Sequence, residues 1–251
     1  MATAADVTPP ADDRKLLAPV WHTVVLVLFI FATAYLQTHF SSRIENSPSG
    51  NRVGLYLFSM CFEFILLGYV WFLGVRQSGV KFGDIVGGKW TRAADFWRDV
   101  GVACLFWLVV IVFLLFASRV MGVNTHAQKA LQLLMPRSAL EMVMWVILSV
   151  AAGFCEEFVF RGYLQKQFFA FFGSTAVAIG AQAIVFGAAH GYQGVKGMLT
   201  ITMYGALFGI LAVMRKSLRP GMIQHAMQDA SAGIAMSLLA KYRPDQLSLF
   251  F

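Results

Sequence analysis

The chain has 251 residues and a formal net charge of +7, and 58% of its residues are hydrophobic but only 13% are charged. Soluble domains carry about 25% charged residues, so this composition excludes an ordinary soluble domain. The apolar residues gather in runs of about 20, the length that crosses roughly 30 Å of hydrocarbon. We therefore expect an all-α integral membrane protein, a polytopic bundle of seven or eight transmembrane helices. The positive charge suits contact with the lipid bilayer's anionic headgroups, and without a soluble basic stretch we expect no nucleic-acid binding.

The N-terminal half is predicted to hold a polar tail over residues 1–19 and three spans within residues 20–137. The tail lacks a basic start followed by a short apolar run and a cleavage site, so we expect the first span to be retained. A basic connection with scattered aromatic residues is expected to lie on the membrane surface. The predicted spans are 20–40, 54–75 and 99–122, and the surface connection is 76–98.

The C-terminal half is predicted to form a four-span region over residues 138–240, followed by a tail over 241–251. Its first helix should begin at a capping box, in which Ser138 and Glu141 satisfy each other's backbone amides. The expected spans are 138–168, 173–190, 195–215 and 220–240. Lys and Arg are more numerous on the side of the N-terminus and the 76–98 connection, so we expect that side to be cytoplasmic.

Three ionisable residues, Glu156, Glu157 and Arg161, end one of the most apolar runs. A charged side chain at bilayer depth costs roughly 2.5–3.5 kcal/mol, so such residues usually face a cavity and have a function. Residues four apart share a helix face, so Glu157 should pair with Arg161. Glu156 points elsewhere and stays available as a general base. The alternative is a charge pair that only packs helices together.

Two later apolar runs each carry a histidine, His190 and His225. Glu156 and His190 lie at similar distances from the expected turn near residue 171, so antiparallel helices would bring them to one level. Asp229 shares a helix face with His225 and could fix its tautomer, bind a metal or donate a proton. Glu63 also lies in an apolar run, and the sequence assigns it no role.

Together these motifs resemble those of the CPBP family of intramembrane proteases, which includes the type II CAAX prenyl endopeptidases and the bacterial Abi proteins. The family pattern is Glu-Glu-x-x-x-Arg, then Phe-x-x-x-His, then His-x-x-x-Asn/Asp, and it is matched here over about residues 138–240. The resemblance implies a catalytic set of Glu156, His190, His225 and Asp229, with structural support from Glu157, Arg161 and Phe186. It further implies hydrolysis of a peptide bond in a membrane-associated, sometimes lipidated, protein or peptide by a glutamate-activated water.

The resemblance leaves the metal open, because zinc or another divalent cation could be bound by Glu156, His190, His225 and Asp229. Two histidines and a carboxylate form an acceptable catalytic zinc set. The usual His-Glu-x-x-His signature is absent, and the ligands are spread over three helices, which favours a metal-free mechanism. An ionised Asp229 accepts hydrogen bonds only, so it cannot itself stabilise an oxyanion.

Two other classes of protein fit the same residues. A proton-coupled transporter could use intramembrane Glu, Asp and His as a relay, although the inverted repeat common in such folds is not apparent. A non-catalytic membrane scaffold, such as a bacteriocin-immunity protein, could keep the motifs for stability. The sequence favours the protease because a scaffold needs neither both histidines nor an unpaired glutamate.

Overall fold

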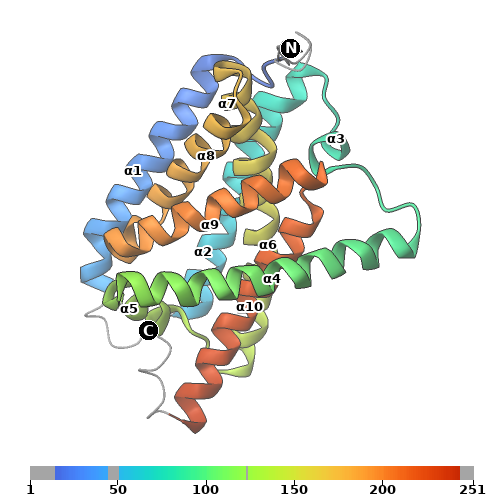
Figure 1. The fold of residues 1–251 in the computed structure, drawn as a ribbon. Coiled ribbons are helices and arrows are strands. Elements are labelled where there is room, and N and C mark those ends of the chain that lie inside the picture. Colours follow the sequence, from blue (N-terminus) through green and yellow to red (C-terminus); the bar gives the residue numbers. More distant parts are fainter. Residues whose placement is uncertain (1–14, 45–50, 123, 244–251) are drawn as a thin grey trace, which may run out of the picture.

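The computed structural model describes residues 15–44, 51–122 and 124–243, so most of both predicted tails lies outside the described residues. The described part consists of helices joined by turns and contains no strand, as the sequence predicts (Figure 1). The N-terminal elements are α1 (Val20–Ile44), α2 (Arg52–Gly68) with its continuations η2 (Tyr69–Gly74) and η3 (Val75–Ser78), α3 (Phe82–Val86), α4 (Ala93–Met121) and α5 (Thr125–Leu134). The C-terminal elements are α6 (Ala139–Glu156), η4 (Glu157–Leu164), α7 (Gln165–Phe172), α8 (Thr175–Ala189), η5 (Gly191–Gln193), α9 (Gly194–Arg215) and α10 (Arg219–Tyr242).

Among the described residues, five helical segments are long and apolar enough to cross a membrane, which makes this a multi-pass integral membrane protein. They are Val20–His39, Arg52–Ser78, Ala93–Met121, Ala139–Phe172 and Gly191–Arg215. The predicted count of seven or eight spans is not confirmed, although all seven predicted segments are helical. Helix α8 is apolar but short, and α10 is diluted by polar residues such as Gln224, Gln228 and Asp229.

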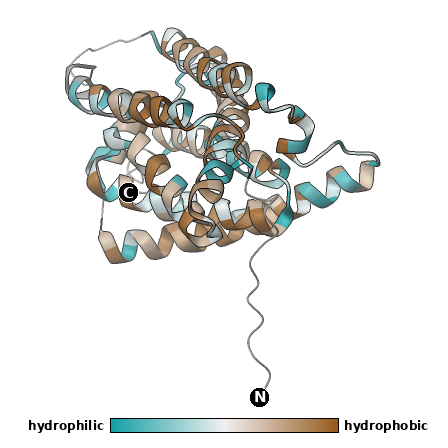
Figure 2. Cartoon of the chain, turned by 90° about the horizontal axis from the view of Figure 1, so that it is seen from above, coloured by the Kyte–Doolittle hydropathy of each residue, from teal (hydrophilic) through white to brown (hydrophobic). Residues whose placement is uncertain are grey.

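Large apolar side chains cover the outside of the bundle. On α4, Leu105, Val112 and Phe116 are each about two-thirds exposed, at 68%, 67% and 66%. A soluble monomer rarely leaves contiguous surface of this kind open to water. Figure 2 shows the same apolar character running along most of the helices, so we assign this surface to contact with lipid.

The helix that carries the Glu-Glu-x-x-x-Arg motif lies at the centre of the bundle. It continues from α6 through η4 into α7 without a break, and every residue of the π-helical segment η4 is buried. Phe158, Tyr163 and Leu164 of η4 are fully buried in the apolar core. π-Helical turns are rare and occur frequently at functional sites, which fits the position of Glu157 and Arg161 within this one.

The start of α6 follows the predicted cap only in part. Ser138 Oγ accepts a hydrogen bond from the Glu141 backbone amide at 3.2 Å, as expected. The Glu141 carboxylate, however, accepts from the backbone amide of Arg137 at 2.7 Å, one residue before the helix cap. The bond from Ser138 to Glu141 is therefore that of a capping box, but the bond back from Glu141 reaches Arg137 instead of Ser138. The amphipathic helix α5, just before this cap, was not predicted.

Helices α6 and α10 pack so closely that a glycine is required between them. A methyl group on Gly153 would lie 2.7 Å from the Ala226 backbone nitrogen and 2.9 Å from the Met222 carbonyl oxygen. Both obstacles are backbone atoms and cannot rotate away. Farther along, the Trp145 indole donates a hydrogen bond to the Asp229 backbone oxygen at 2.9 Å. These contacts fix the height at which the polar residues of α10 face α6.

We expect Gly153→Ala to destabilise the protein by about 1–3 kcal/mol, because the added methyl overpacks a rigid helix crossing. Gly180→Ala is the matched control, since a methyl there meets nothing within 4 Å. Alanine is the better helix former, so the control should be neutral or slightly stabilising. Thermal unfolding of both variants in detergent tests this, and equal melting temperatures would contradict the close α6–α10 contact.

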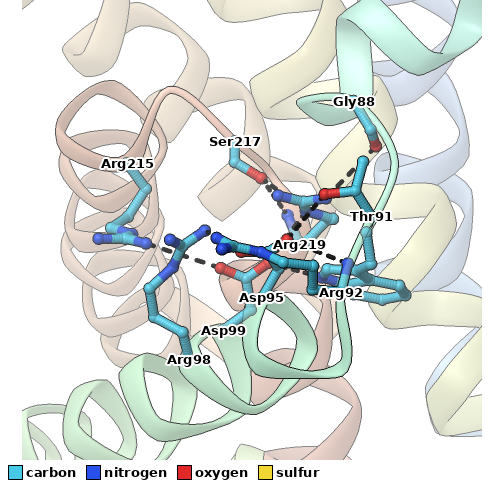
Figure 3. Close-up of polar contacts among 10 residues, drawn as sticks. Gly88, Thr91, Arg92, Asp95, Arg98, Asp99, Arg215, Ser217 and Arg219 are labelled. Carbon is cyan, nitrogen blue, oxygen red and sulfur yellow. Dashed lines mark hydrogen bonds and ion pairs between the residues drawn. The ribbon is translucent and has the colours of Figure 1, made fainter.

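The basic connection at 76–98 is bound to the C-terminal half of the chain by polar contacts (Figure 3). Asp99, at the start of α4, is buried and accepts a hydrogen bond from the Trp90 indole at 2.8 Å. It also lies 3.0 Å from Arg219 Nε and 3.6 Å from an Arg215 guanidinium nitrogen. Beside this cluster the Leu218 amide donates to the Val86 carbonyl at 2.9 Å. The connection thereby fixes the turn from which α10 starts.

Candidate active site

The predicted ion pair within the first motif is present. Arg161 Nη1 lies 2.8 Å from Glu157 Oε1, and both side chains are buried. The second guanidinium nitrogen donates to the Gly205 carbonyl on α9 at 3.1 Å. Arg161 therefore connects η4 to α9 inside the bundle, and the prediction that Glu157 pairs with it is confirmed.

Phe186, predicted as a supporting residue, lies between the charged pair and both histidines. The Arg161 guanidinium sits 4.2 Å from the centre of its ring, within the range of a cation–π interaction. The His190 ring packs edge-on against Phe186 at 4.9 Å, and the His225 ring lies 6.3 Å away. A single aromatic ring thus separates and orients three polar side chains.

Glu157 has a second contact that the sequence did not indicate. Its Oε1 lies 3.1 Å from His225 Nδ1, so the imidazole can donate to the same carboxylate that pairs with Arg161. Asp229, which the sequence offered as the group that sets the His225 tautomer, is 3.6 Å from the other ring nitrogen, Nε2. This exceeds a normal hydrogen-bond distance. The carboxylate that orients the ring is therefore Glu157 rather than Asp229.

Glu156 has different neighbours from Glu157 and forms no ion pair with Arg161 among the described residues. Its Oε2 is buried and has no hydrogen-bond partner among the described residues. The same oxygen lies 3.7 Å from His225 Nε2. A buried carboxylate oxygen without a partner is costly and calls for an explanation, such as a water or substrate group that binds there.

Glu63, to which the sequence assigned no role, lies beside this carboxylate. Helix α2 packs against α6 and places the Glu63 carboxyl close enough to Glu156 for the two groups to interact electrostatically. No spacing rule could have found this contact, because it depends on how α2 and α6 pack.

His190 ends α8 and has a defined tautomer. Its Nδ1 lies 2.9 Å from the Phe186 carbonyl oxygen. A carbonyl can only accept, so Nδ1 must carry the proton. The second ring nitrogen, Nε2, then keeps its lone pair and can accept a hydrogen bond from a water or substrate group.

All four residues of the predicted catalytic set line one cavity of about 320 Å³. Helix α10 supplies His225 and Asp229, α6 supplies Glu156, and the end of α8 supplies His190. The wall is completed by residues that the sequence did not indicate, from α5 and from three aromatic positions: Ala127, Ala130, Leu131, Leu134, Trp145, Tyr192 and Tyr204. The cavity lining thus combines apolar side chains with a few ionisable ones, as ligand-binding sites commonly do.

The possible metal set, Glu156, His190, His225 and Asp229, was tested against this geometry. Among the described residues, no group of three His, Cys, Asp or Glu side chains is arranged to hold a metal ion. Each histidine has one nitrogen bound to the protein, His225 to Glu157 and His190 to the Phe186 carbonyl, as metal-ligating histidines also do, so the lack of fit rests on how the four side chains are arranged. The arrangement does not fit a metal centre as it stands, so no catalytic step is assigned to a metal.

An unpartnered carboxylate, an imidazole with a free lone pair and a second, carboxylate-held imidazole meet in one cavity between membrane helices. Carboxylates and imidazoles are the groups that enzymes use most often as general acids and bases. Residues 138–231 match the family model described as Type II CAAX prenyl endopeptidase Rce1-like, which confirms the resemblance based on the motifs. The match supports a CAAX intramembrane endopeptidase in general and covers the helices that carry Glu156, His190, His225 and Asp229. No curated protein and no solved structure matches the chain.

Proposed function

We propose that this protein is an intramembrane endopeptidase that hydrolyses a peptide bond of a membrane-associated protein or peptide with a water activated by Glu156. The observation that carries the proposal is that Glu156 lines the cavity and that its buried Oε2 has no hydrogen-bond partner among the described residues. A carboxylate free of protein donors keeps its basicity for a bound water. Glu157, held by Arg161 and His225, lacks this freedom.

In the proposed reaction a water binds between Glu156 and Nε2 of His190. Glu156 takes one proton, and the resulting hydroxide attacks the carbonyl carbon of the scissile bond. The carbonyl oxygen becomes an oxyanion, which His225 can stabilise from Nε2 when that nitrogen carries a proton. Collapse of the tetrahedral intermediate breaks the carbon–nitrogen bond, and Glu156 returns its proton to the leaving amine. Glu157 keeps the His225 ring oriented throughout.

The substrate class can be tested in cells and with purified protein. Membrane peptides from cells that express the wild type or Glu156→Gln should differ in a set of fragments present only with the wild type. The purified wild type should also cleave an internally quenched, farnesylated peptide with a CAAX terminus, and its non-prenylated twin shows whether the lipid is required. Identical peptide profiles and no cleavage by the wild type would favour a scaffold or transporter instead.

Asp229 separates the metal-free mechanism from a metal-dependent one. We expect Asp229→Asn to keep activity within about tenfold of the wild type, because Glu157 rather than Asp229 orients His225 and because Asn can donate to an oxyanion. If Asp229 were a metal ligand, losing its charge should weaken metal binding about 10-fold or more, by analogy with outer-shell ligand mutations. Metal analysis and chelator treatment of both proteins decide this. Stoichiometric zinc in the active wild type, lost together with activity in Asp229→Asn, would contradict the metal-free mechanism.

A further inference from the structure

The cavity contains Asp229, which when ionised can accept hydrogen bonds but not donate them. A developing oxyanion needs hydrogen-bond donors aimed at it, and each such donor typically contributes a factor of about 10²–10³ to kcat. An ionised Asp229 only accepts. Of the groups described so far, His225 is the one that can donate, and a second donor must come from elsewhere in the wall.

Tyr204 of α9 lines the same cavity as Glu156, His225 and Asp229. The side chain is buried, with 9% of the residue exposed, and packs against Phe208 at a ring distance of 4.7 Å. Its ring lies 6.3 Å from that of His225, almost perpendicular at 89°. The phenol is therefore held within the group of residues that would handle the reaction.

The Tyr204 hydroxyl is buried and has no hydrogen-bond partner among the described residues. The Gln224 amide is a polar neighbour but does not meet the geometry of a hydrogen bond, and both of its polar atoms are also unpartnered within the described part. A buried donor that is left without a hydrogen bond costs roughly 1–3 kcal/mol of stability. Because Tyr204 is one of the residues that line the cavity, a ligand atom that accepts from this hydroxyl would remove that cost.

The backbone beneath Tyr204 is fixed by the charged motif itself. The carbonyl of the next residue, Gly205, accepts from Arg161 at 3.1 Å and from Gln182 at 3.0 Å. The absence of a side chain at Gly205 allows α9 to lie this close to the Phe186 ring, since a methyl group there would be 2.9 Å from the ring. The ion pair of Glu157 and Arg161 thus holds both His225, through Glu157, and Tyr204, through Gly205.

We infer that Tyr204 is a further catalytic residue, whose hydroxyl donates a hydrogen bond to the carbonyl oxygen of the scissile peptide as that oxygen becomes an oxyanion. This role rests on the proposed endopeptidase function. The phenol keeps its proton throughout, so no bond of Tyr204 forms or breaks. Together with His225 it supplies the two donors that an oxyanion site requires, and it takes the place of the donor that Asp229 cannot offer.

The test is the steady-state kinetics of Tyr204→Phe on the quenched farnesylated peptide, with Tyr35→Phe as the matched control. Tyr35 is 62% exposed on α1 and lies outside the cavity lining. We expect kcat of Tyr204→Phe to fall about 100-fold with KM nearly unchanged, because the bond strengthens only in the transition state. The melting temperature should be maintained, since the lost hydroxyl has no partner in the described structure. Tyr35→Phe should match the wild type.

Three results would overturn the role of Tyr204. A kcat within twofold of the wild type would remove Tyr204 from the mechanism and leave the endopeptidase intact. A loss of activity that parallels a lower melting temperature would mean that the hydroxyl only supports the fold. A wild type that does not cleave this peptide, or cleaves it no better than Glu156→Gln, and that also leaves the membrane peptides of cells unchanged, would overturn the proposed function and this role with it.

Discussion

Glu156→Gln is expected to abolish peptide hydrolysis while the protein still inserts, purifies and melts like the wild type. The amide is isosteric with the carboxylate but cannot take a proton from water, so the proposed general base is lost. General-base catalysis alone contributes typically 10²–10⁴-fold, and activity should fall by at least about that factor. Turnover of the quenched farnesylated peptide by the purified protein measures the loss.

The structure also explains why this variant should stay folded. Glu156 Oε2 has no hydrogen-bond partner to lose in the described structure, and its carboxyl lies near those of Glu63 and Asp229. Neutralising it removes repulsion among these groups, so the melting temperature should be equal to or above that of the wild type. A variant that keeps wild-type turnover, or that fails to fold, would contradict the assignment of Glu156.

Contacts within one helix could be predicted from the sequence. The pairing of Glu157 with Arg161 follows from residues four apart sharing a face, and it holds within the π-helical turn. The helical segments follow from hydropathy, because each span must satisfy its own backbone in lipid. The shared level of Glu156 and His190 follows from their similar distances to the turn, which the structure places at Gly173.

Contacts between helices could not be predicted, because they depend on crossing angles and glycine positions. His225 lies only six residues after Arg219, so a count of residues along an ideal helix places it roughly 9 Å from that end and does not bring it level with Glu156. The bond from His225 to Glu157 requires the close α6–α10 approach at Gly153. The position of Glu63 beside Glu156 requires the packing of α2 on α6. Figure 1 shows α4 and α9 inclined steeply across the bundle, which a count of residues along straight helices cannot anticipate.

The number of spans is not confirmed for a related reason. Hydropathy assigns each apolar run to lipid, whereas several helices here are covered by protein. Helix α10 packs against α6 and α4, and Gln228 on α10 accepts a hydrogen bond from the Trp107 indole at 2.7 Å. Polar residues are tolerated on such a helix because its neighbours satisfy them. Helix α5 was missed because its mixture of polar and apolar residues resembles a connecting loop.

Glu157→Gln should have the opposite pattern from Glu156→Gln, with a large loss of stability as well as of activity. Glu157 is the carboxylate for both Arg161, at 2.8 Å, and His225, at 3.1 Å. Removing one partner of a buried ion pair typically costs 3–5 kcal/mol, because the remaining charge is left uncompensated. We expect a loss on the order of 3 kcal/mol, since the amide still offers one acceptor oxygen.

The double variant Glu157→Gln/Arg161→Met distinguishes an uncompensated charge from a simple packing defect. If the uncompensated charge of Arg161 causes the loss, removing that charge should recover part of the stability. The double variant should then lose less unfolding free energy than the two single variants added together. Activity should not return, because His225 still lacks its orienting carboxylate and Gly205 its contact with Arg161. Unfolding in detergent, measured for all four proteins, gives the coupling. A Glu157→Gln protein that is as stable as the wild type but inactive, beside an unstable Glu156→Gln, would reverse the two roles.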